Sequence, residues 1–273
     1  MADVHASYYT DPACPASWAL EPVLRRLVVE LGAQLHVRLV MGGLAREFGP
    51  PLPTVGAWLD AADASGMPVD PRLWLHHPPG SSYPACMAVK AAGEQGAEIE
   101  AAYLRRVREG WACGRRRLDS ADALVNEARE VPGLDLGRFE VDLRSHGTVE
   151  RFGADLDLAA AVDAAHHGEG TGRVRLPSLE LRGVDGDEVH GVYGAQPYEA
   201  YRAAAEAAGA SFAAAERPSV EEALRRFGRL ALPEVAAVCD LPGPRAAAEL
   251  WRLAGEWRVR AERRLSGELW SLA

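Results

Sequence analysis

The chain has 273 residues, of which 48% are hydrophobic and 25% charged, and its formal net charge is −9. This composition is typical of a folded globular protein and excludes a largely disordered chain. No run of about 18 uninterrupted apolar residues predicts a membrane span. The first residues lack the basic and apolar regions of a secretory signal, so we expect a cytoplasmic protein.

The charge is distributed unevenly along the chain. Residues 216–273 contain ten Arg against nine Asp or Glu, a net charge of +1, which leaves −10 for residues 1–215. An acidic body argues against nucleic-acid binding. The four cysteines are too few for a disulfide scaffold, and since no two form a CxxC pair, structural zinc is also disfavoured.

The first 42 residues predict a β-α-β unit. Residues 3–10 are rich in Val, Tyr and Thr and indicate a strand. Pro15 suits the first position of a helix, and apolar residues with helical spacing continue from Leu20 to Leu31. Residues 35–41 alternate between two faces and predict a second strand.

A long helical block follows a passage rich in Pro and Gly. Helices are predicted near residues 54–64, 82–96, 98–112, 119–130, 135–145 and 148–166. Strands over 178–182 and 188–193 come next. The Asp185-Gly186 pair between them predicts a hairpin turn, and a helix over 197–208 ends this part.

The C-terminal residues predict three helices and a hairpin. Ser219 and Glu222 form a capping-box pattern at the start of a helix over 219–228. Helices over 232–239 and 244–256 follow, and residues 257–263 and 268–272 flank a turn at Leu265-Ser266-Gly267. This succession resembles a winged helix.

Cys14 is the main chemical candidate. It lies between a predicted strand and a predicted helix, where unpaired N–H groups and the helix dipole favour a thiolate and lower the thiol pKa. Ser17 lies one turn further on, close enough to donate a hydrogen bond to the sulfur. The competing interpretation is that Cys14 is a small buried residue.

Leu176-Pro177 is the second feature. Pro177 directly precedes the strand predicted over 178–182. Thioredoxin folds have a proline at this place, in a cis bond opposite the cysteine. The competing interpretation is a proline at the first residue of an edge strand.

Together these features make the chain resemble the DsbA-like thioredoxin-fold family, in its FrnE-type cytoplasmic branch. The resemblance covers about residues 3–205 in order. The segments that carry it are Asp11-Pro12-Ala13-Cys14-Pro15 with Trp18 and Glu21-Pro22, Val40-Met41-Gly42-Gly43-Leu44, Ser65-Gly66-Met67-Pro68, Ser81-Ser82-Tyr83-Pro84-Ala85-Cys86, Leu176-Pro177-Ser178 and Gly194-Ala195-Gln196-Pro197-Tyr198.

The resemblance implies an α/β fold with a thioredoxin-like domain over residues 1–53 and 168–210. A helical domain over residues 54–167 would be inserted into it, and a small winged-helix-like α+β domain would occupy residues 216–273. It also implies that Cys14 is the thiolate nucleophile and that Pro15, Trp18, Leu176 and Pro177 contact the substrate. Ser17 and the helix N-terminus would stabilise the thiolate, so Cys14 and Ser17 are the catalytic candidates.

One departure from the family is decisive for the chemistry. The family has Cys-x-x-Cys, whereas this chain has Ser17 at the second position, so the usual resolving thiol is missing. Three outcomes are open: a monothiol resolved by glutathione or another small thiol, resolution by Cys86 or Cys113, or a binding role.

The main hypothesis is a thiol–disulfide oxidoreductase or isomerase that uses Cys14 as a monothiol nucleophile on protein or small-molecule disulfides. The alternatives are a non-catalytic adaptor on the same fold and a kappa-type glutathione transferase or isomerase. Glu21, which would handle protons, and Cys86 are secondary candidates. We expect no metal and no resident cofactor, and we expect a protein partner for the C-terminal domain.

Overall fold

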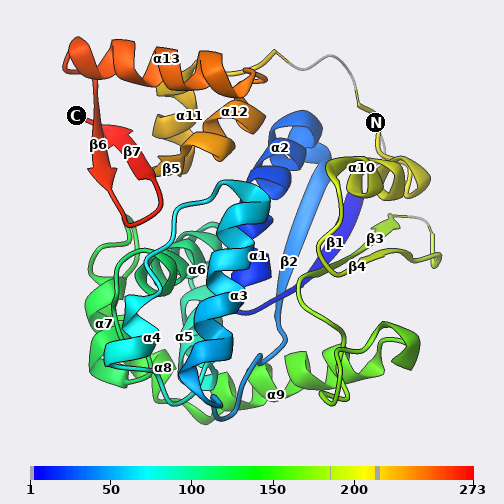
Figure 1. Ribbon diagram of the computed structural model, residues 1–273. Helices are drawn as coiled ribbons and strands as arrows, with labels where there is room; N and C mark the ends of the chain where they lie inside the picture. Colours follow the sequence, from blue (N-terminus) through cyan, green and yellow to red (C-terminus); the bar gives the residue numbers. More distant parts are fainter. Residues whose placement is uncertain (1–2, 185, 213–215) are drawn as a thin grey trace.

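The computed structural model describes residues 3–184, 186–212 and 216–273 (Figure 1). Its larger sheet has the strand order β2-β1-β3-β4, made of β1 (Val4–Thr10), β2 (Leu35–Met41), β3 (Ser178–Gly183) and β4 (His190–Tyr193). β1 is parallel to β2 and antiparallel to β3. The order of elements, β-α-β followed by helices and then β-β-α, agrees with the predicted order.

The helix predicted from Pro15 onward is broken at Leu20. α1 (Pro15–Ala19) has only five residues, and α2 (Glu21–Leu31) begins directly after the break. Pro22 lies in the first turn of α2 and has no N–H to continue the hydrogen-bond ladder of α1. The prediction of one continuous helix was therefore wrong, and a 3₁₀ turn (Gly32–Gln34) links α2 to β2.

Seven helices of the described chain lie between β2 and β3. They are α3 (Pro51–Ser65), α4 (Arg72–His76), α5 (Tyr83–Gly93), α6 (Ala97–Ala112), α7 (Ala121–Ala128), α8 (Leu136–Leu143) and α9 (His146–Ala161), followed by a 3₁₀ turn (Ala164–His166). α4 is not among the predicted helices, and the helix predicted to end at residue 166 stops at Ala161. α3 packs against α1, the short helix that follows Cys14.

The helical block and the sheet share one hydrophobic core. Tyr8 and Leu181 of the sheet belong to the same buried cluster as Trp58, Trp111 and Phe139 of the helices. The boundaries at residues 53/54 and 167/168 therefore divide the chain within a common core, and this division stays a proposal.

β3 and β4 pair as an antiparallel hairpin, and α10 (Tyr198–Ala207) follows it. The predicted Asp185-Gly186 turn lies partly outside the described residues, because Asp185 is not described. The same holds for residues 213–215 in the predicted linker to the C-terminal segment.

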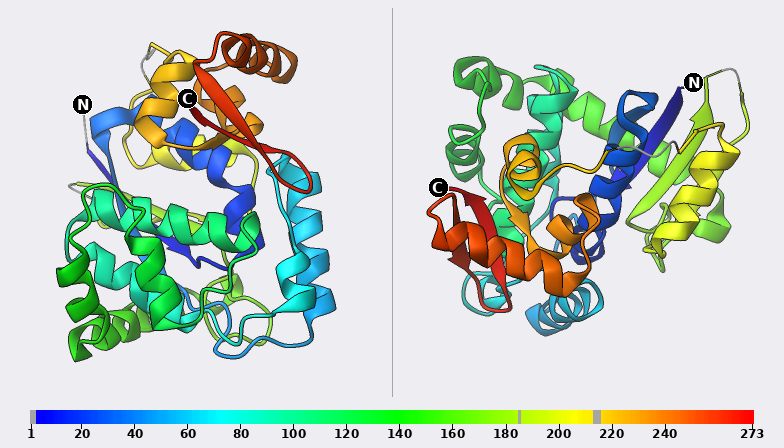
Figure 2. Two further views of the ribbon diagram at one scale, coloured as in Figure 1. Left: turned by 90° about the vertical axis from the view of Figure 1, so that its left-hand side faces the viewer. Right: turned by 90° about the horizontal axis from the view of Figure 1, so that it is seen from above.

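The C-terminal segment contains α11 (Val220–Phe227), β5 (Leu230–Ala231), α12 (Leu232–Val238), α13 (Gly243–Gly255), β6 (Val259–Arg263) and β7 (Glu268–Leu272). α11 has the predicted capping box of Ser219 and Glu222. The strand β5, which has two residues, is not among the predicted elements; the sheet order is β5-β7-β6. In Figures 1 and 2 this sheet lies on the side of the molecule away from β3 and β4.

The C-terminal sheet packs on both of its faces. Trp270 of β7 joins a cluster with Leu224, Leu250 and Val29, the last of which comes from α2. Leu269, on the opposite face of β7, belongs to the main core. At the hairpin tip, Val69 N–H donates to Ser266 Oγ at 2.8 Å. The C-terminal segment is therefore packed against the rest of the protein rather than tethered to it.

Lys90 of α5 is the only lysine in the sequence, and its side chain is largely buried. Its Nζ donates to the Leu39 carbonyl at 3.1 Å and to Glu100 at 2.9 Å, and it lies 3.2 Å from Asp155. This amine pairs with two buried carboxylates and ties α5, α6 and α9 to β2.

Candidate functional site

Cys14 caps the helix that it precedes. Its backbone is extended (φ −79°, ψ 114°), and its Sγ accepts a hydrogen bond from the Ser17 backbone N–H at 3.4 Å. Its own N–H donates to the Asp11 carbonyl at 3.2 Å. The sulfur therefore occupies the place that a serine or aspartate oxygen takes at an N-cap.

Asp11 holds the turn that carries Cys14. Its Oδ1 accepts from Ala13 N–H at 2.7 Å. Its Oδ2 accepts from Leu44 N–H at 2.6 Å, from Ser82 Oγ at 2.8 Å and from Cys86 Sγ at 3.1 Å. Burial raises the pKa of Asp11, and these donors act against that rise. The sequence shows this residue only as part of a motif, because its partners lie far along the chain.

The pKa of Cys14 moves in the direction opposite to the prediction. The residue is only 3% exposed, and burial raises the pKa of its thiol. Ser17 lowers it without cancelling the effect of burial, and the charge of Asp11 raises it further. Burial therefore acts against the predicted thiolate, and the catalytic role of Cys14 stays a prediction.

The other cysteines are also buried thiols, and none of the four is in a disulfide. Cys86 donates to Asp11, and burial raises its pKa well above the ordinary value. Cys113 donates to the Pro68 carbonyl at 2.9 Å, and burial raises its pKa to about 12. Burial raises the pKa of Cys239 to about 11. Neither Cys86 nor Cys113 is placed as an accessible resolving thiol.

The Leu176-Pro177 loop lies at the same end of the sheet as the Cys14 turn. Tyr9 of β1 pairs with Ser178, so Pro177 is next to Thr10, and the Leu176–Pro177 peptide bond is cis. Gly42, which follows β2, lies directly against the Leu176 side chain, because a Cβ on Gly42 would come within 2.7 Å of it. The two sequence features that predict the site are thus brought together.

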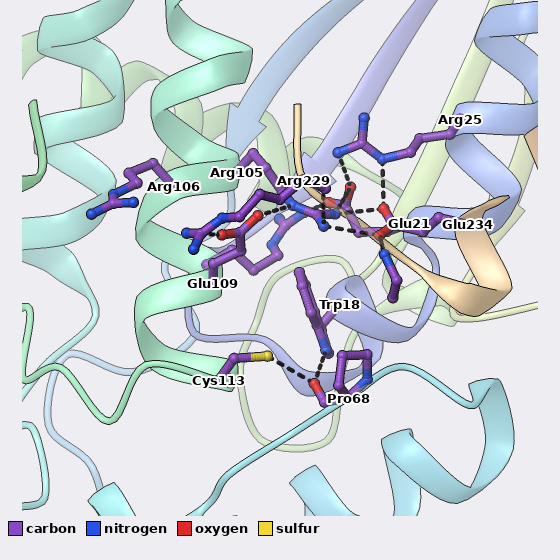
Figure 3. Close-up of polar contacts among 12 residues, drawn as sticks. Trp18, Glu21, Arg25, Pro68, Arg105, Arg106, Glu109, Cys113, Arg229 and Glu234 are labelled. Carbon is purple, nitrogen blue, oxygen red and sulfur yellow. Dashed lines mark hydrogen bonds and ion pairs between the residues drawn. The ribbon is translucent and has the colours of Figure 1, made fainter. Parts of the chain in front are cut away.

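Trp18 does not face a substrate. Its side chain is fully buried, and its Nε1 donates to the Pro68 carbonyl at 2.9 Å (Figure 3). The Arg105 guanidinium lies over its ring, 4.6 Å from the centroid. Ser17 is buried as well, whereas Pro15 is half-buried. The prediction that Trp18 contacts the substrate was wrong, because the ring fills the space between α1, α6 and the Pro68 loop.

Glu21 is an ion-pair partner rather than a proton carrier. Its carboxylate accepts from Arg105 at 3.0 Å, is bonded to Arg108 and lies 3.4 Å from Arg25. Burial alone would raise the pKa of Glu21, but these three guanidinium groups lower it to about 2. A carboxyl group that stays ionised at neutral pH cannot deliver a proton there.

The ion-pair network continues from Glu21 into the C-terminal segment (Figure 3). Glu234 of α12 accepts from Arg105 at 2.6 and 2.9 Å and from Arg25 at 2.6 Å. Arg229 is paired with Glu109 of α6. The sequence contained a signal for this network, because Arg105 and Arg108 interrupt the apolar face of a predicted helix.

No group of three or more His, Cys, Asp and Glu side chains in the described ranges is arranged to hold a metal ion. Within those ranges, no helix combines the length and apolar character required to cross a membrane.

Comparison with known proteins gives matches at three levels. A family model described as thioredoxin matches residues 8–167. The ClpXP adapter protein SpxH of Halalkalibacterium halodurans is 27% identical, and that of Bacillus subtilis 28%; both alignments cover 96% of this chain, and 86% and 87% of the relatives. The cytosolic disulfide reductase DsbM from Pseudomonas aeruginosa is 22% identical with a TM-score of 0.58, over 74% of this chain and 97% of its own.

We predict that Cys14 resists alkylation in the folded protein. Because burial raises the pKa of its thiol, iodoacetamide at pH 8 should modify Cys14 much more slowly than it modifies free glutathione. Peptide mapping by mass spectrometry measures this, and the same reaction in urea is the control. If iodoacetamide modified native Cys14 faster than it modifies glutathione, the raised pKa of the Cys14 thiol would be contradicted.

We predict that Glu21→Gln lowers the free energy of unfolding by about 3 kcal/mol, because Arg105 and Arg108 lose a buried counterion. Chemical denaturation measures the change, and Glu169→Gln in an exposed loop is the control.

The same glutamate should make stability depend on pH. Its pKa is about 2 in the folded state and about 4.3 in an unfolded chain, so its contribution is present above pH ~4.3 and is lost as the pH falls towards 2. Glu21→Gln should flatten this acid limb. An unchanged limb in the variant would show that other carboxyl groups cause it.

Proposed function

The chain belongs to the thioredoxin family, and we propose that within it the chain is a protein-binding adaptor rather than a thiol catalyst. The predicted α/β fold class and the resemblance to DsbA-like proteins are confirmed by the match over residues 8–167 and by the structural neighbours. The function of Cys14 does not follow from this membership, because this chain has Ser17 where the second cysteine of a Cys-x-x-Cys motif would stand.

The state of Cys14 is the observation that carries the proposal. Thiol–disulfide exchange begins with attack by a thiolate. An ordinary cysteine is a few per cent thiolate at pH 7, and a raised pKa leaves Cys14 with less. Its sulfur is also engaged as the cap of α1. The observed structure therefore supports a scaffold at this position better than a nucleophile.

The relatives support the same proposal over nearly the whole chain. Proteins named ClpXP adapter align with 96% of this chain, including the C-terminal segment that the thioredoxin match does not reach. We therefore propose that ClpXP is the partner for which this chain is an adaptor. The network through Glu234 supports such a role, because it holds both parts of the chain in one fixed arrangement.

Monothiol exchange at Cys14, with glutathione or another small thiol as co-substrate, is the second candidate. The placement of the Leu176-Pro177 loop beside the Cys14 turn favours it. It requires a movement that exposes the sulfur, since Cys14 is buried. A glutathione transferase or isomerase activity would likewise require a glutathione site.

We predict that the chain binds purified ClpXP and that Cys14→Ser binds with an affinity within about twofold of the wild type, because the serine oxygen can also cap α1. Biolayer interferometry measures both affinities, and circular dichroism checks that the variant is folded. Insulin reduction with glutathione should be no faster with the protein than without it.

Either of two results would overturn this proposal. One is disulfide turnover that depends on Cys14, which would favour monothiol catalysis. The other is failure of the folded wild-type chain to bind ClpXP at micromolar concentrations.

A further inference from the structure

β6 is the outer strand of the C-terminal sheet (Figure 1). Arg264 N–H donates to Gly267 O, and Ala273 N–H donates to Arg258 O. Hydrogen-bonded pairs alternate along an antiparallel ladder, so Val259, Ala261 and Arg263 turn their backbone groups away from β7. Residues 260–263 are all exposed. This edge is open to a further strand from another chain.

Trp257, two residues before β6, has an unfavourable backbone conformation. It is 87% exposed and has φ = 59°, in the left-handed region that glycine usually occupies after a helix. Its N–H donates to Ala254 O, and the Arg258 N–H to Leu253 O, so the residue ends α13 as a C-cap glycine would. No packing of the ring in the described part of the chain offsets this conformation, which points to a use outside the fold.

A second exposed tryptophan lies beside the same edge. Trp251 of α13 is 59% exposed and packs edge-on against Trp270, with the ring centroids 4.9 Å apart. Trp270 pairs with Ala261, so the side chains of both lie on one face of the sheet. Trp251 therefore adds an exposed aromatic ring to the face of the sheet on which the Ala261 side chain lies.

The charge of the edge favours an acidic partner. Arg260 and Arg263 lie on β6, and neither is within ion-pair distance of an acidic group in residues 3–184, 186–212 or 216–273. Arg260 donates a hydrogen bond to Ser271 Oγ of β7 at 2.9 Å. Glu262, which lies between the two arginines on β6, is paired with Arg229 and Arg264. Residues 216–273, which contain both, have a net charge of +1, against −10 for residues 1–215. Opposite charges on adjacent strands stabilise pairing.

We propose that the outer edge of β6 binds an extended segment of a partner protein by strand addition. The segment has acidic side chains opposite Arg260 and Arg263 and an apolar side chain opposite Ala261, over Trp251. This inference rests on the adaptor function proposed above and names the surface and the partner chemistry. An aromatic anchor with flanking charge pairs is the arrangement in which a few residues supply most of the binding energy.

The experiment uses the full chain and fluorescein-labelled peptides of about ten residues. Two peptides carry Glu-Leu-Ser-Glu or its reverse at the centre, one for each strand direction, and two matched peptides carry Lys in place of both Glu. By fluorescence anisotropy we expect one Glu peptide to bind, and its Lys counterpart to bind at least about tenfold more weakly.

Two variants test the edge itself. Ala261→Pro removes an outward N–H without removing a hydrogen bond to β7, and it should weaken peptide binding about tenfold or more. Ala261→Ser, which keeps the N–H, is the matched control.

Trp257→Gly should weaken binding while leaving a melting temperature at or above that of the wild type, since glycine accepts the left-handed conformation.

The proposal fails if neither Glu peptide binds the wild type at about 1 mM. It also fails if the Lys peptides bind as well as the Glu peptides, or if Ala261→Pro binds like the wild type. Because this assay contains no ClpXP, a failure here leaves the adaptor proposal standing. If the wild-type chain binds a Glu peptide but does not bind ClpXP, only the adaptor proposal is overturned.

Discussion

The arrangement of the molecule depends on the buried ion pairs that the Arg105 side chain makes. It donates to Glu21 of α2, to Glu109 of its own helix and to Glu234 of α12, and it lies over the ring of Trp18. One buried guanidinium thus joins the thioredoxin helix, the helical block and the C-terminal segment (Figure 3). Burying so many charges is favourable only when each is paired, so loss of one partner destabilises all three parts together.

The same constraint involves two of the residues predicted for a redox site. Trp18 is predicted to contact the substrate and Glu21 to handle protons, but both contact Arg105 in the buried network. Cys14 caps α1, and Asp11 beneath it accepts hydrogen bonds from Ser82 and Cys86 of the helical block. The residues of the thioredoxin site therefore hold the parts of this chain together, which is compatible with a protein whose task is to present fixed surfaces.

The sequence predicts the elements well where periodicity is strong and less well where long-range contacts decide. Pro22 contained the information for the helix break at Leu20, whereas α4, with five residues, and β5, with two, are too short to give a pattern. The location of Cys14 followed from its strand–turn–helix context. The direction of its pKa did not, because the burial that raises it depends on contacts between segments far apart in the sequence.

Lys90 has a consequence for how this protein can be modified. It is the only lysine, and its amine is held by Glu100, Asp155 and the Leu39 carbonyl. Enzymes and reagents that act on lysine side chains, including those that attach a protein tag, therefore meet a folded chain with no accessible lysine amine. For the adaptor role proposed above, this means that the chain can stay unmarked at lysine while the protein it delivers is marked.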